Sequence, residues 1–431
     1  MNAFAGTQDT LPASLWAATA IEAPPTPRAE GRQKADVAIV GGGYLGLTTA
    51  LALAEAGTDV IVLEAAEPGW GASGRNGGQV IPGLKLDPDE LVQQFGAERG
   101  GRMVAFAGSA PDVVFSNIVR YGIDCQPVRN GWIQPAHSDT SRALLERRCA
   151  AWQRHGADVD LLSADETARL IGTNVYCGGW IDRRGGGIQP LSYARGIAKA
   201  AIAAGVRLHG RSKVDAITRT GRQWRVQTDA AEIVADQVLI CTNAYSGRLG
   251  GDLQRTVIAP NSFQIATRPL SDNIRRTMLP EGHVASDARR LLLYYRIDHT
   301  GRLLVGGRGS FRNPSHPDHF KHLKRALAAL FPQAADSEID YYWSGRVAIT
   351  LDHMPHLHQL GPGLVAALGC NGRGVALTSA TGRVLAQWFC DHRDDELPLP
   401  FTRARKVPFH ELQELYVAAA SSWYRLRDWM T

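Results

Sequence analysis

The sequence predicts an α/β protein in which a parallel sheet with βαβ connections is interleaved with an α+β domain built on an antiparallel sheet. Three observations predict this class. Residues 35–64 have the pattern strand, glycine turn, helix and strand; residues 364–389 repeat the strand, turn and helix; and residues 259–345 alternate short strand-like segments. Strands that alternate with helices are typical of parallel sheets, whereas successive strands are typical of antiparallel sheets.

The first glycine turn has the spacing of a dinucleotide-binding turn. Residues 36–40 form an apolar strand, and Gly41, Gly43 and Gly46 follow it as G-x-G-x-x-G. In this pattern the first glycine permits the tight turn and the second lets the backbone approach a pyrophosphate. The third lets the helix pack closely on the strand.

The residues after the glycines complete a βαβ unit. Residues 45–56 are rich in Ala and Leu and predict a helix, whose first N–H groups would face the phosphates. Gly57 ends this helix and residues 60–63 form the next strand. Glu64 follows where an acid can hydrogen-bond a ribose hydroxyl. We therefore predict a Rossmann-like, dinucleotide-binding domain, the alternative being a glycine-rich turn in another kind of α/β protein.

A second glycine-rich stretch, residues 68–79, predicts a loop next to a ligand. So many glycines indicate sharp turns or a close approach of the backbone to another group. Trp70, Ser73, Arg75 and Asn76 lie among them, and side chains of these types favour a ligand-facing loop. A flexible surface loop is the alternative.

The remaining segments indicate how the chain is divided. Residues 86–170 are mainly helical, residues 192–204 predict another helix, and residues 238–244 predict a buried parallel strand that ends in small polar residues. The expected antiparallel strands are 263–267, 291–295 and 303–306. The expected division is an irregular leader at 1–34, a cofactor domain at 35–100, 190–258 and 346–400, a substrate domain at 101–189 and 259–345, and a linker and helix at 401–431.

Composition and charge are those of an ordinary globular protein. The chain has 431 residues, 44% hydrophobic and 21% charged, with a net charge of +5. This length predicts two domains, and the scattered basic residues fit an anionic cofactor rather than a nucleic-acid partner. The six cysteines show neither CxxC spacing nor a His pattern, so we expect no metal site and free thiols in a reducing cytosol.

No signal peptide or spanning apolar run is evident, which favours a cytoplasmic protein. Residues 409–430 resemble an amphipathic helix that ends in Trp423, Tyr424 and Trp429. We expect this helix to dock on the protein's own surface. Peripheral contact with the inner membrane, or with a partner, is the alternative.

The motifs resemble those of the D-amino-acid-oxidase-like superfamily of FAD-dependent oxidoreductases, which includes sarcosine oxidase, glycine oxidase and γ-glutamylputrescine oxidase. The resemblance covers nearly the whole chain. It is carried by VAIVGGGYLGLTTALALAEAG, VIVLEA, GWGASGRNGGQ and GCNGRGVALTSATG. The glycine-rich loop at 74–78 is most similar to that of the γ-glutamylputrescine oxidase and L-pipecolate oxidase branch.

The resemblance implies FAD as the cofactor. Sarcosine oxidases tether the flavin through a Cys before the last strand, but residues 346–356 contain no Cys, so we expect non-covalent FAD. The implied cofactor contacts are Gly41, Gly43, Tyr44, Leu45, Gly46, Glu64, Ala65, Ala72, Ser73, Arg75, Asn76, Gly77, Gly78, Val214, Asn371, Gly372, Arg373, Gly374 and Val375.

The resemblance also implies a reaction, the oxidation of a carbon–nitrogen bond in a small amine or an amino or imino acid. A hydride would pass from the carbon next to nitrogen to flavin N5, water would hydrolyse the imine, and oxygen would reoxidise the flavin to give hydrogen peroxide. Two alternatives stay open. The protein could be a dehydrogenase that passes electrons to a quinone or carrier, or a binding protein that holds FAD without catalysis.

Candidate catalytic residues follow from the same comparison. Arg346 is the first candidate and Arg308 the second for binding a substrate carboxylate, because a guanidinium can hold a carboxylate with two parallel hydrogen bonds. His353 and Tyr295 complete the expected catalytic set. His356 is expected close to the same face, where either histidine could tune the protonation of the substrate. Tyr294 and Tyr295 lie on an alternating strand, so only one of them can face the pocket. For each residue a purely structural role is the alternative.

Overall fold

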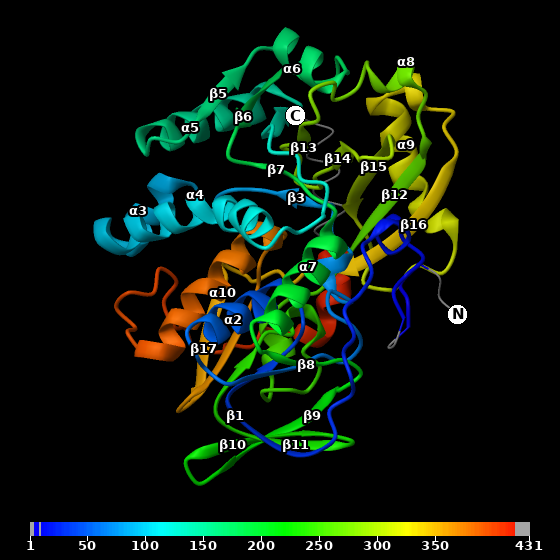
Figure 1. Ribbon diagram of the computed structural model, residues 1–431. Coiled ribbons are helices and arrows are strands. Elements are labelled where there is room, and N and C mark those ends of the chain that lie inside the picture. Colours follow the sequence, from blue (N-terminus) through cyan, green and yellow to red (C-terminus); the bar gives the residue numbers. More distant parts are fainter. Residues whose placement is uncertain (1–3, 8–9, 419–431) are drawn as a thin grey trace.

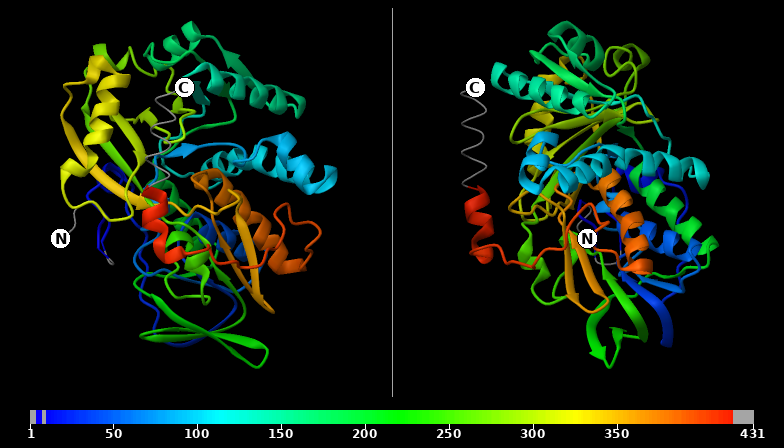
Figure 2. Two further views of the ribbon diagram at one scale, coloured as in Figure 1. Left: turned by 180° about the vertical axis from the view of Figure 1, so that it is seen from behind. Right: turned by 90° about the vertical axis from the view of Figure 1, so that its left-hand side faces the viewer.

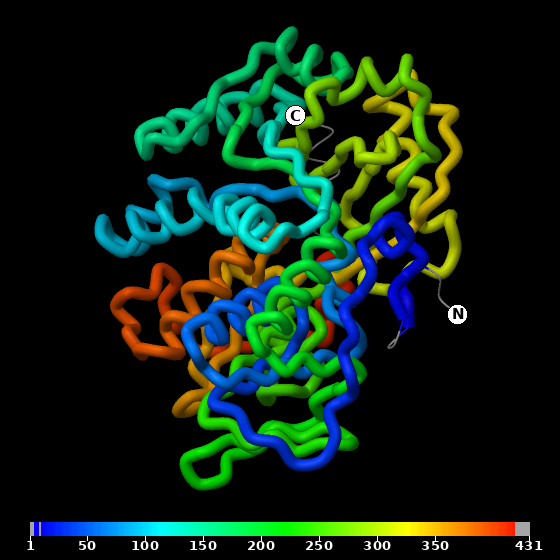
Figure 3. The backbone as a smooth tube through the Cα atoms, in the orientation of Figure 1, coloured from blue at the N-terminus to red at the C-terminus, as the bar shows by residue number. Residues whose placement is uncertain are grey.

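The computed structural model describes residues 4–7 and 10–418. The chain forms two large sheets with helices packed around them, one in the lower half of Figure 1 and one across the upper half. The tube in Figure 3 shows how the chain passes between them. It leaves the first sheet after β2, returns through α7, leaves again after β11, and returns after β16. The predicted α/β class with interleaved sheets is confirmed.

The helices and strands have the following bounds. The α-helices are α1 Leu15–Thr19, α2 Tyr44–Glu55, α3 Pro88–Phe95, α4 Ala97–Arg120, α5 Asp139–Arg154, α6 Ala164–Ile171, α7 Pro190–Ala203, α8 Asp272–Arg275, α9 Lys321–Leu330 and α10 Gly374–Asp391. The strands are β1 Gly31–Val40, β2 Val60–Leu63, β3 Gln79–Val80, β4 Trp132–Ala136, β5 Val159–Leu162, β6 Gly178–Asp182, β7 Gly186–Gly187, β8 Arg207–His209, β9 Val214–Thr220, β10 Gln223–Thr228, β11 Ala231–Ile240, β12 Asn261–Pro269, β13 Val284–Ser286, β14 Tyr294–Ile297, β15 Arg302–Arg308, β16 Ile339–Arg346, β17 His356–Gly361 and β18 Leu364–Leu368.

The first sheet has the order β17-β18-β11-β1-β2-β8, with β9 and β10 attached beside β11. The pairs β18/β11, β11/β1, β1/β2 and β2/β8 are parallel. Helices α2, α7 and α10 lie against one another along one face (Figure 1). Strand β1 begins at Gly31, earlier than the expected residue 36, because Gly31 to Ala35 pair with the long strand β11.

Both faces of the first sheet are buried, which explains the continuous apolar run of β1. Val37 and Ile39 belong to the core that includes the helices, whereas Ala38 and Val40 belong to a second core with the β9–β10 hairpin. Alternate residues of a strand point to opposite faces. A strand covered on both faces therefore reads as uniformly apolar.

The second sheet has the order β16-β12-β15-β14-β13-β4-β6-β5. It is antiparallel apart from the β13/β4 pair, which is parallel and joins the two sequence segments that build this sheet. The expected antiparallel sheet is therefore nearly right, and the difference lies at the one joint between segments far apart in sequence. Helix α9 covers this sheet on the side away from the first sheet (Figure 2).

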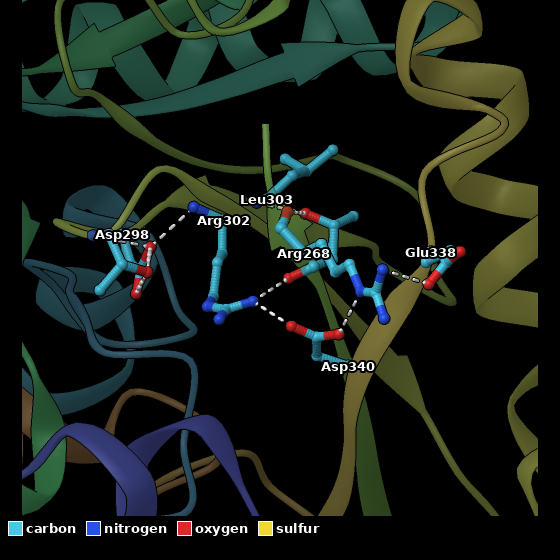
Figure 4. Close-up of polar contacts among 8 residues, drawn as sticks. Arg268, Asp298, Arg302, Leu303, Glu338 and Asp340 are labelled. Atoms are coloured by element: carbon cyan, nitrogen blue, oxygen red, sulfur yellow. Dashed lines mark hydrogen bonds and ion pairs between the residues drawn. The ribbon is translucent and has the colours of Figure 1, made fainter. Parts of the chain in front are cut away.

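Ion pairs between β12, β15 and β16 tie the outer strands of the second sheet together (Figure 4). Asp340 accepts hydrogen bonds from both Arg268 and Arg302, and Arg268 also pairs with Glu338 at 2.8 Å. The backbone N–H of Arg302 donates to Asp298 at 2.8 Å. None of these residues lines the cavity described below, so we assign them to the strand arrangement.

The N-terminal segment packs more closely than the expected irregular leader. Ser14 caps α1, and Trp16 is fully buried in a cluster with Trp343 and Leu304. The expected helix at 409–430 begins in the structure after a 3-10 turn at His410–Leu412, and its part from residue 419 onward lies outside the described residues.

Candidate active site

A cavity of about 640 Å³ lies at the carboxyl ends of the parallel strands. Its wall includes Val40, Leu63, Cys241 and Leu368, which end or directly follow β1, β2, β11 and β18. In open α/β sheets this edge is where ligands bind. Of the expected cofactor contacts, the wall contains Gly41, Gly43, Tyr44, Leu45, Glu64, Ala65, Ala72, Ser73 and Val214.

The glycines of the first turn each have a physical reason. Gly41 has a φ of +114°, which side chains rarely permit. A Cβ on Gly46 would lie 2.1 Å from the carbonyl oxygen of Gly41, so Gly46 permits α2 to pack against the turn without itself lining the cavity. A Cβ on Gly43 would lie 2.9 Å from Ser73 Oγ. The turn therefore leaves the start of α2 open to the cavity.

The start of α2 can hold an anion. Gly43 is the N-cap residue and supplies no side chain to the first N–H groups of the helix. Ser73 Oγ accepts from the N–H of Tyr44 at 3.1 Å, and Leu45 lines the cavity. Free N–H groups and the helix dipole at such an end favour phosphate.

Glu64 lies in the wall with its carboxylate held by backbone. Its two oxygens accept from the N–H of Gly42 at 2.6 Å and of Ala66 at 3.0 Å. Burial raises the pKa of Glu64, and these two N–H groups oppose that rise. A carboxylate can accept further hydrogen bonds. Glu64 is therefore a fixed acceptor at the cavity, as ribose recognition requires.

The glycine-rich loop is held from beneath by Tyr44 and by the N-terminal segment. The hydroxyl of Tyr44 lies 2.6 Å from the carbonyl oxygen of Ser73 and accepts from the Asn76 side-chain amide at 3.2 Å. Trp16 Nε1 donates to the carbonyl oxygen of Asn76 at 2.7 Å. Arg75 is 3% exposed and donates to the carbonyl oxygens of Trp70 and Ala5.

Part of this loop supports the cavity without lining it. Arg75, Asn76, Gly77 and Gly78 are absent from the described wall. Gly77 faces the Tyr294 ring, which a Cβ would approach to 2.8 Å, and Gly78 has a φ of +67°. Packing explains the small residues Gly77 and Gly78 equally well. Contact of Arg75, Asn76, Gly77 and Gly78 with the cofactor therefore stays a prediction.

The second glycine turn, residues 371–375, lies behind the wall. Asn371 has a φ of +52° and accepts from the N–H of Thr350 at 3.0 Å, which fixes the turn. Gly374 and Val375 begin α10, and Arg373 is its N-cap. The described wall here consists of Cys370 before the turn and of Leu377, Thr378 and Thr381 after it. Contact of Asn371, Gly372, Arg373, Gly374 and Val375 with cofactor stays a prediction too.

The expected catalytic residues fall in different places. Arg346 lines the cavity, and its backbone N–H donates to the hydroxyl of Tyr245 at 3.0 Å. His353 is exposed and outside the wall. Tyr295 is fully buried in the core of the second sheet, with its hydroxyl 3.1 Å from that of Tyr176 and its ring against Phe331. This differs from the expectation that Tyr295 faces a pocket.

Other wall residues had little signal in the sequence. Cys241, Asn243 and Tyr245 follow β11, where small polar residues at a strand end were the only indication. His356, unlike these three, was expected near the active face, and it lines the cavity and bonds Asp352 at 3.0 Å. Burial alone would raise the pKa of Asp352, but hydrogen bonds from His356 and from the N–H of Met354 hold it at about 2.

Comparison with known proteins identifies this arrangement. Residues 36–388 match the family described as "DAO: FAD dependent oxidoreductase". The chain belongs to this family. The cavity fits its cofactor, since the open start of α2 suits a diphosphate and Glu64 suits a ribose.

Similar proteins support the same assignment. γ-Glutamylputrescine oxidoreductase of Escherichia coli is 34% identical over 404 residues, covering 91% of this chain and 92% of that protein. The probable oxidoreductase OrdL of Rhizobium meliloti is 33% identical over 425 residues, covering 96% and 97%. Glycine oxidase from Geobacillus kaustophilus has a similar fold, with a TM-score of 0.71, 23% identity, and coverage of 86% of this chain and 99% of that one. The chain is thus an FAD-dependent oxidoreductase.

Throughout residues 4–7 and 10–418, no three His, Cys, Asp or Glu side chains gather as metal ligands would. In the same part of the chain, no helix is both long and apolar enough to cross a membrane.

Proposed function

We propose that this oxidoreductase oxidises the carbon–nitrogen bond of a small amine, with a γ-glutamyl derivative of putrescine as the leading substrate, and uses oxygen as the electron acceptor. The proposed substrate rests on one observation, the 34% identity with γ-glutamylputrescine oxidoreductase over 91% of the chain. Identity at this level across the full length supports a related chemistry, although a shared fold alone would not.

The residues of the cavity hold and orient the reactants. Gly43 and Leu45 would bind the FAD diphosphate at the start of α2, and Glu64 would accept from the ribose hydroxyl. Bound FAD supplies the capacity to accept a hydride from the carbon next to nitrogen. The polypeptide therefore needs to exclude water, position the amine, and keep it neutral.

Arg346 is our candidate for contact with an anionic group in the cavity. Its side chain forms no ion pair within the described part of the chain, and it lies beside Tyr245, whose ring is 5.5 Å from that of Trp70. If Arg346 binds the substrate carboxylate, Arg346→Ala will raise KM for a carboxylate-bearing amine and leave KM for a neutral amine unchanged. Equal effects on both amines would remove Arg346 from this role.

We also propose that FAD is not covalently attached. Cys241 and Cys370 line the cavity, so a thiol is available in space even though residues 346–356 lack one. Burial raises the pKa of both thiols, which keeps them protonated and weakly nucleophilic. Acid precipitation should leave yellow FAD in the supernatant, whereas a yellow pellet would contradict the proposal.

Turnover in air tests the reaction class. Wild-type protein is mixed with γ-glutamylputrescine, putrescine, pipecolate, sarcosine, proline or a D-amino acid, and hydrogen peroxide is measured. Peroxide from one of them, in proportion to the substrate consumed, supports an oxidase.

A dehydrogenase is the second candidate, and exposed Phe409, Leu412 and Leu415 favour it as a surface for an electron acceptor or membrane. Reduction of a quinone without peroxide would favour this alternative. A flavin that no compound reduces would favour a protein that holds FAD without catalysis.

A further inference from the structure

Cationic side chains from separate elements gather where α10 meets the second sheet. Lys85 comes from the loop between β3 and α3, Arg148 from α5, and Arg373 from the start of α10. A Cβ on Gly83 would lie 3.1 Å from Arg373 Nη1 and 3.0 Å from the Trp152 ring, which shows how closely these elements approach. The Arg184 guanidinium lies 4.3 Å from the centre of the Trp152 ring.

The two carboxylates near this cluster are paired with Arg148 and with its neighbour Arg184. Asp87 pairs with Arg148 at 2.6 Å, and Asp182 pairs with Arg184 at 2.6 Å. Lys85 and Arg373 form no ion pair within residues 4–7 and 10–418. Arg373 donates to the carbonyl oxygen of Pro82, a neutral group, and in the same residues Lys85 has no hydrogen-bond partner. Two cations are thus left without a counter-charge.

Lys85 and Arg373 are half-buried, and their surroundings disfavour this excess of positive charge. Burial, followed by the like charges of Arg373 and Arg148, lowers the pKa of the Lys85 ammonium to about 7, while Cys370 acts weakly in the other direction. Burial and Arg148 also lower the pKa of Arg373 to about 10, against the opposing effect of Asp87 and Asp182. An anion bound between Lys85 and Arg373 would relieve both effects.

The cluster lies next to the cavity and has apolar walls. Cys370 lines the cavity, interacts electrostatically with Lys85, and has its Sγ 3.2 Å from where a Cβ on Gly374 would lie. Trp132 is 2% exposed, and the Arg373 guanidinium lies 5.4 Å from its ring centre. Aromatic walls with a few convergent cations suit a ligand that joins a methylene chain to an anionic end.

We propose that Lys85 and Arg373 bind a carboxylate of the substrate. A guanidinium can hold a carboxylate with two parallel hydrogen bonds, and an ammonium adds a point charge. The proposal rests on the proposed amine oxidation and narrows its substrate class to amines that carry a carboxylate on their acyl part. It is the alternative to binding by Arg346, because γ-glutamylputrescine carries a single carboxylate. Arg346 lies beside Tyr245 in the cavity wall, whereas Lys85 and Arg373 lie outside the described wall.

Two matched substrates and one binding probe test the site. N-Glutarylputrescine and N-butyrylputrescine share the amide and the amine, but only the first has a carboxylate. Glutarate binding to the FAD-loaded protein is measured by calorimetry, without turnover. The variants are Lys85→Met, Lys85→Arg, Arg346→Ala and, as a control on the exposed side of α7, Lys199→Met.

The expected result follows from the loss of one charge-assisted contact. Lys85→Met should weaken glutarate binding and raise KM for N-glutarylputrescine, each by about tenfold to a hundredfold. It should leave kcat, and KM for N-butyrylputrescine, within about twofold of wild type. Lys85→Arg should weaken glutarate binding less than Lys85→Met does, and Lys199→Met should behave as wild type.

Several results would overturn the proposal. These are no glutarate binding to wild type, equal KM changes for the two amides, or a loss of carboxylate preference in Arg346→Ala alone. If neither amide reduces the flavin, the proposed amine oxidation fails instead. Calorimetry with glutarate still decides the anion site in that case, so the two failures can be told apart.

Discussion

The hydroxyl of Tyr44 should contribute more to the affinity for FAD than the hydroxyl of its neighbour Tyr193. The two rings lie 5.3 Å apart, and the residues are 3% and 0% exposed. The Tyr44 hydroxyl lies 2.6 Å from the carbonyl oxygen of Ser73 and 2.9 Å from that of Pro190. That of Tyr193 lies 3.4 Å from Ser379 Oγ and touches no part of the glycine-rich loop. Phe at each position thus removes the same atom from a similar environment.

The hydrogen bonds of the two hydroxyl groups determine how much the unfolding free energies of the two variants should differ. Tyr44→Phe removes a short donor to the carbonyl oxygens of Ser73 and Pro190 and an acceptor of the Asn76 amide, while Ser73 keeps the Asn76 amide as a donor at 2.8 Å. We expect this loss to cost about 1–3 kcal/mol of unfolding free energy. Tyr193→Phe removes only long hydrogen bonds and should cost about 0.5–1.5 kcal/mol. Because Ser73 lines the cavity, a difference near 1.4 kcal/mol should appear as FAD affinity about tenfold weaker for Tyr44→Phe.

Two measurements decide this prediction. Urea unfolding gives the free energy of unfolding of each variant without added FAD, and flavin fluorescence on dilution gives the FAD dissociation constant. Tyr193→Phe is the control and should keep wild-type FAD affinity within about twofold. Equal FAD affinities in the two variants would refute the idea that Tyr44 holds the loop against the cofactor.

Three further predictions follow. Trp16→Phe should keep most of the packing but lose the bond to Asn76, lowering unfolding free energy by about 1–3 kcal/mol in chemical denaturation; an unchanged midpoint would contradict this. Gly43→Val should yield colourless protein, because its side chain meets Ser73 and occupies the phosphate approach; a yellow, FAD-loaded variant would contradict it. Lys85, with its pKa lowered to about 7 in the folded protein, binds fewer protons there than in the unfolded chain. Unfolding free energy should therefore rise from about pH 7 towards pH 10 more steeply in wild type than in Lys85→Met, as pH-dependent denaturation would measure; equal slopes would contradict it.

Local patterns in the sequence were sufficient to predict the part of the site that faces the cofactor. The turn from Gly41 to Gly46, the helix after it, and Glu64 are close in sequence, and their spacing alone determines how they meet. The ends of α2 and β2 could accordingly be predicted to within a residue or two.

Features that depend on long-range packing could not be predicted. Alternation along β14 shows that Tyr294 and Tyr295 face opposite ways, but only the position of α9 and Phe331 shows which way Tyr295 faces. Lys85 is a single lysine in a loop, without any local pattern. Its environment comes from α5 and the start of α10, which lie far from it in sequence. Contacts between charged residues that lie far apart in the sequence produce no periodic pattern from which they could be predicted.

The most direct test of the proposed function is the visible spectrum of the purified protein, titrated with γ-glutamylputrescine in the absence of oxygen. We predict that the flavin band bleaches in proportion to added amine and returns on admission of air, with release of hydrogen peroxide. A bound flavin that stays fully oxidised at saturating γ-glutamylputrescine, and with every other amine of the panel, would contradict amine oxidation while leaving the family assignment intact.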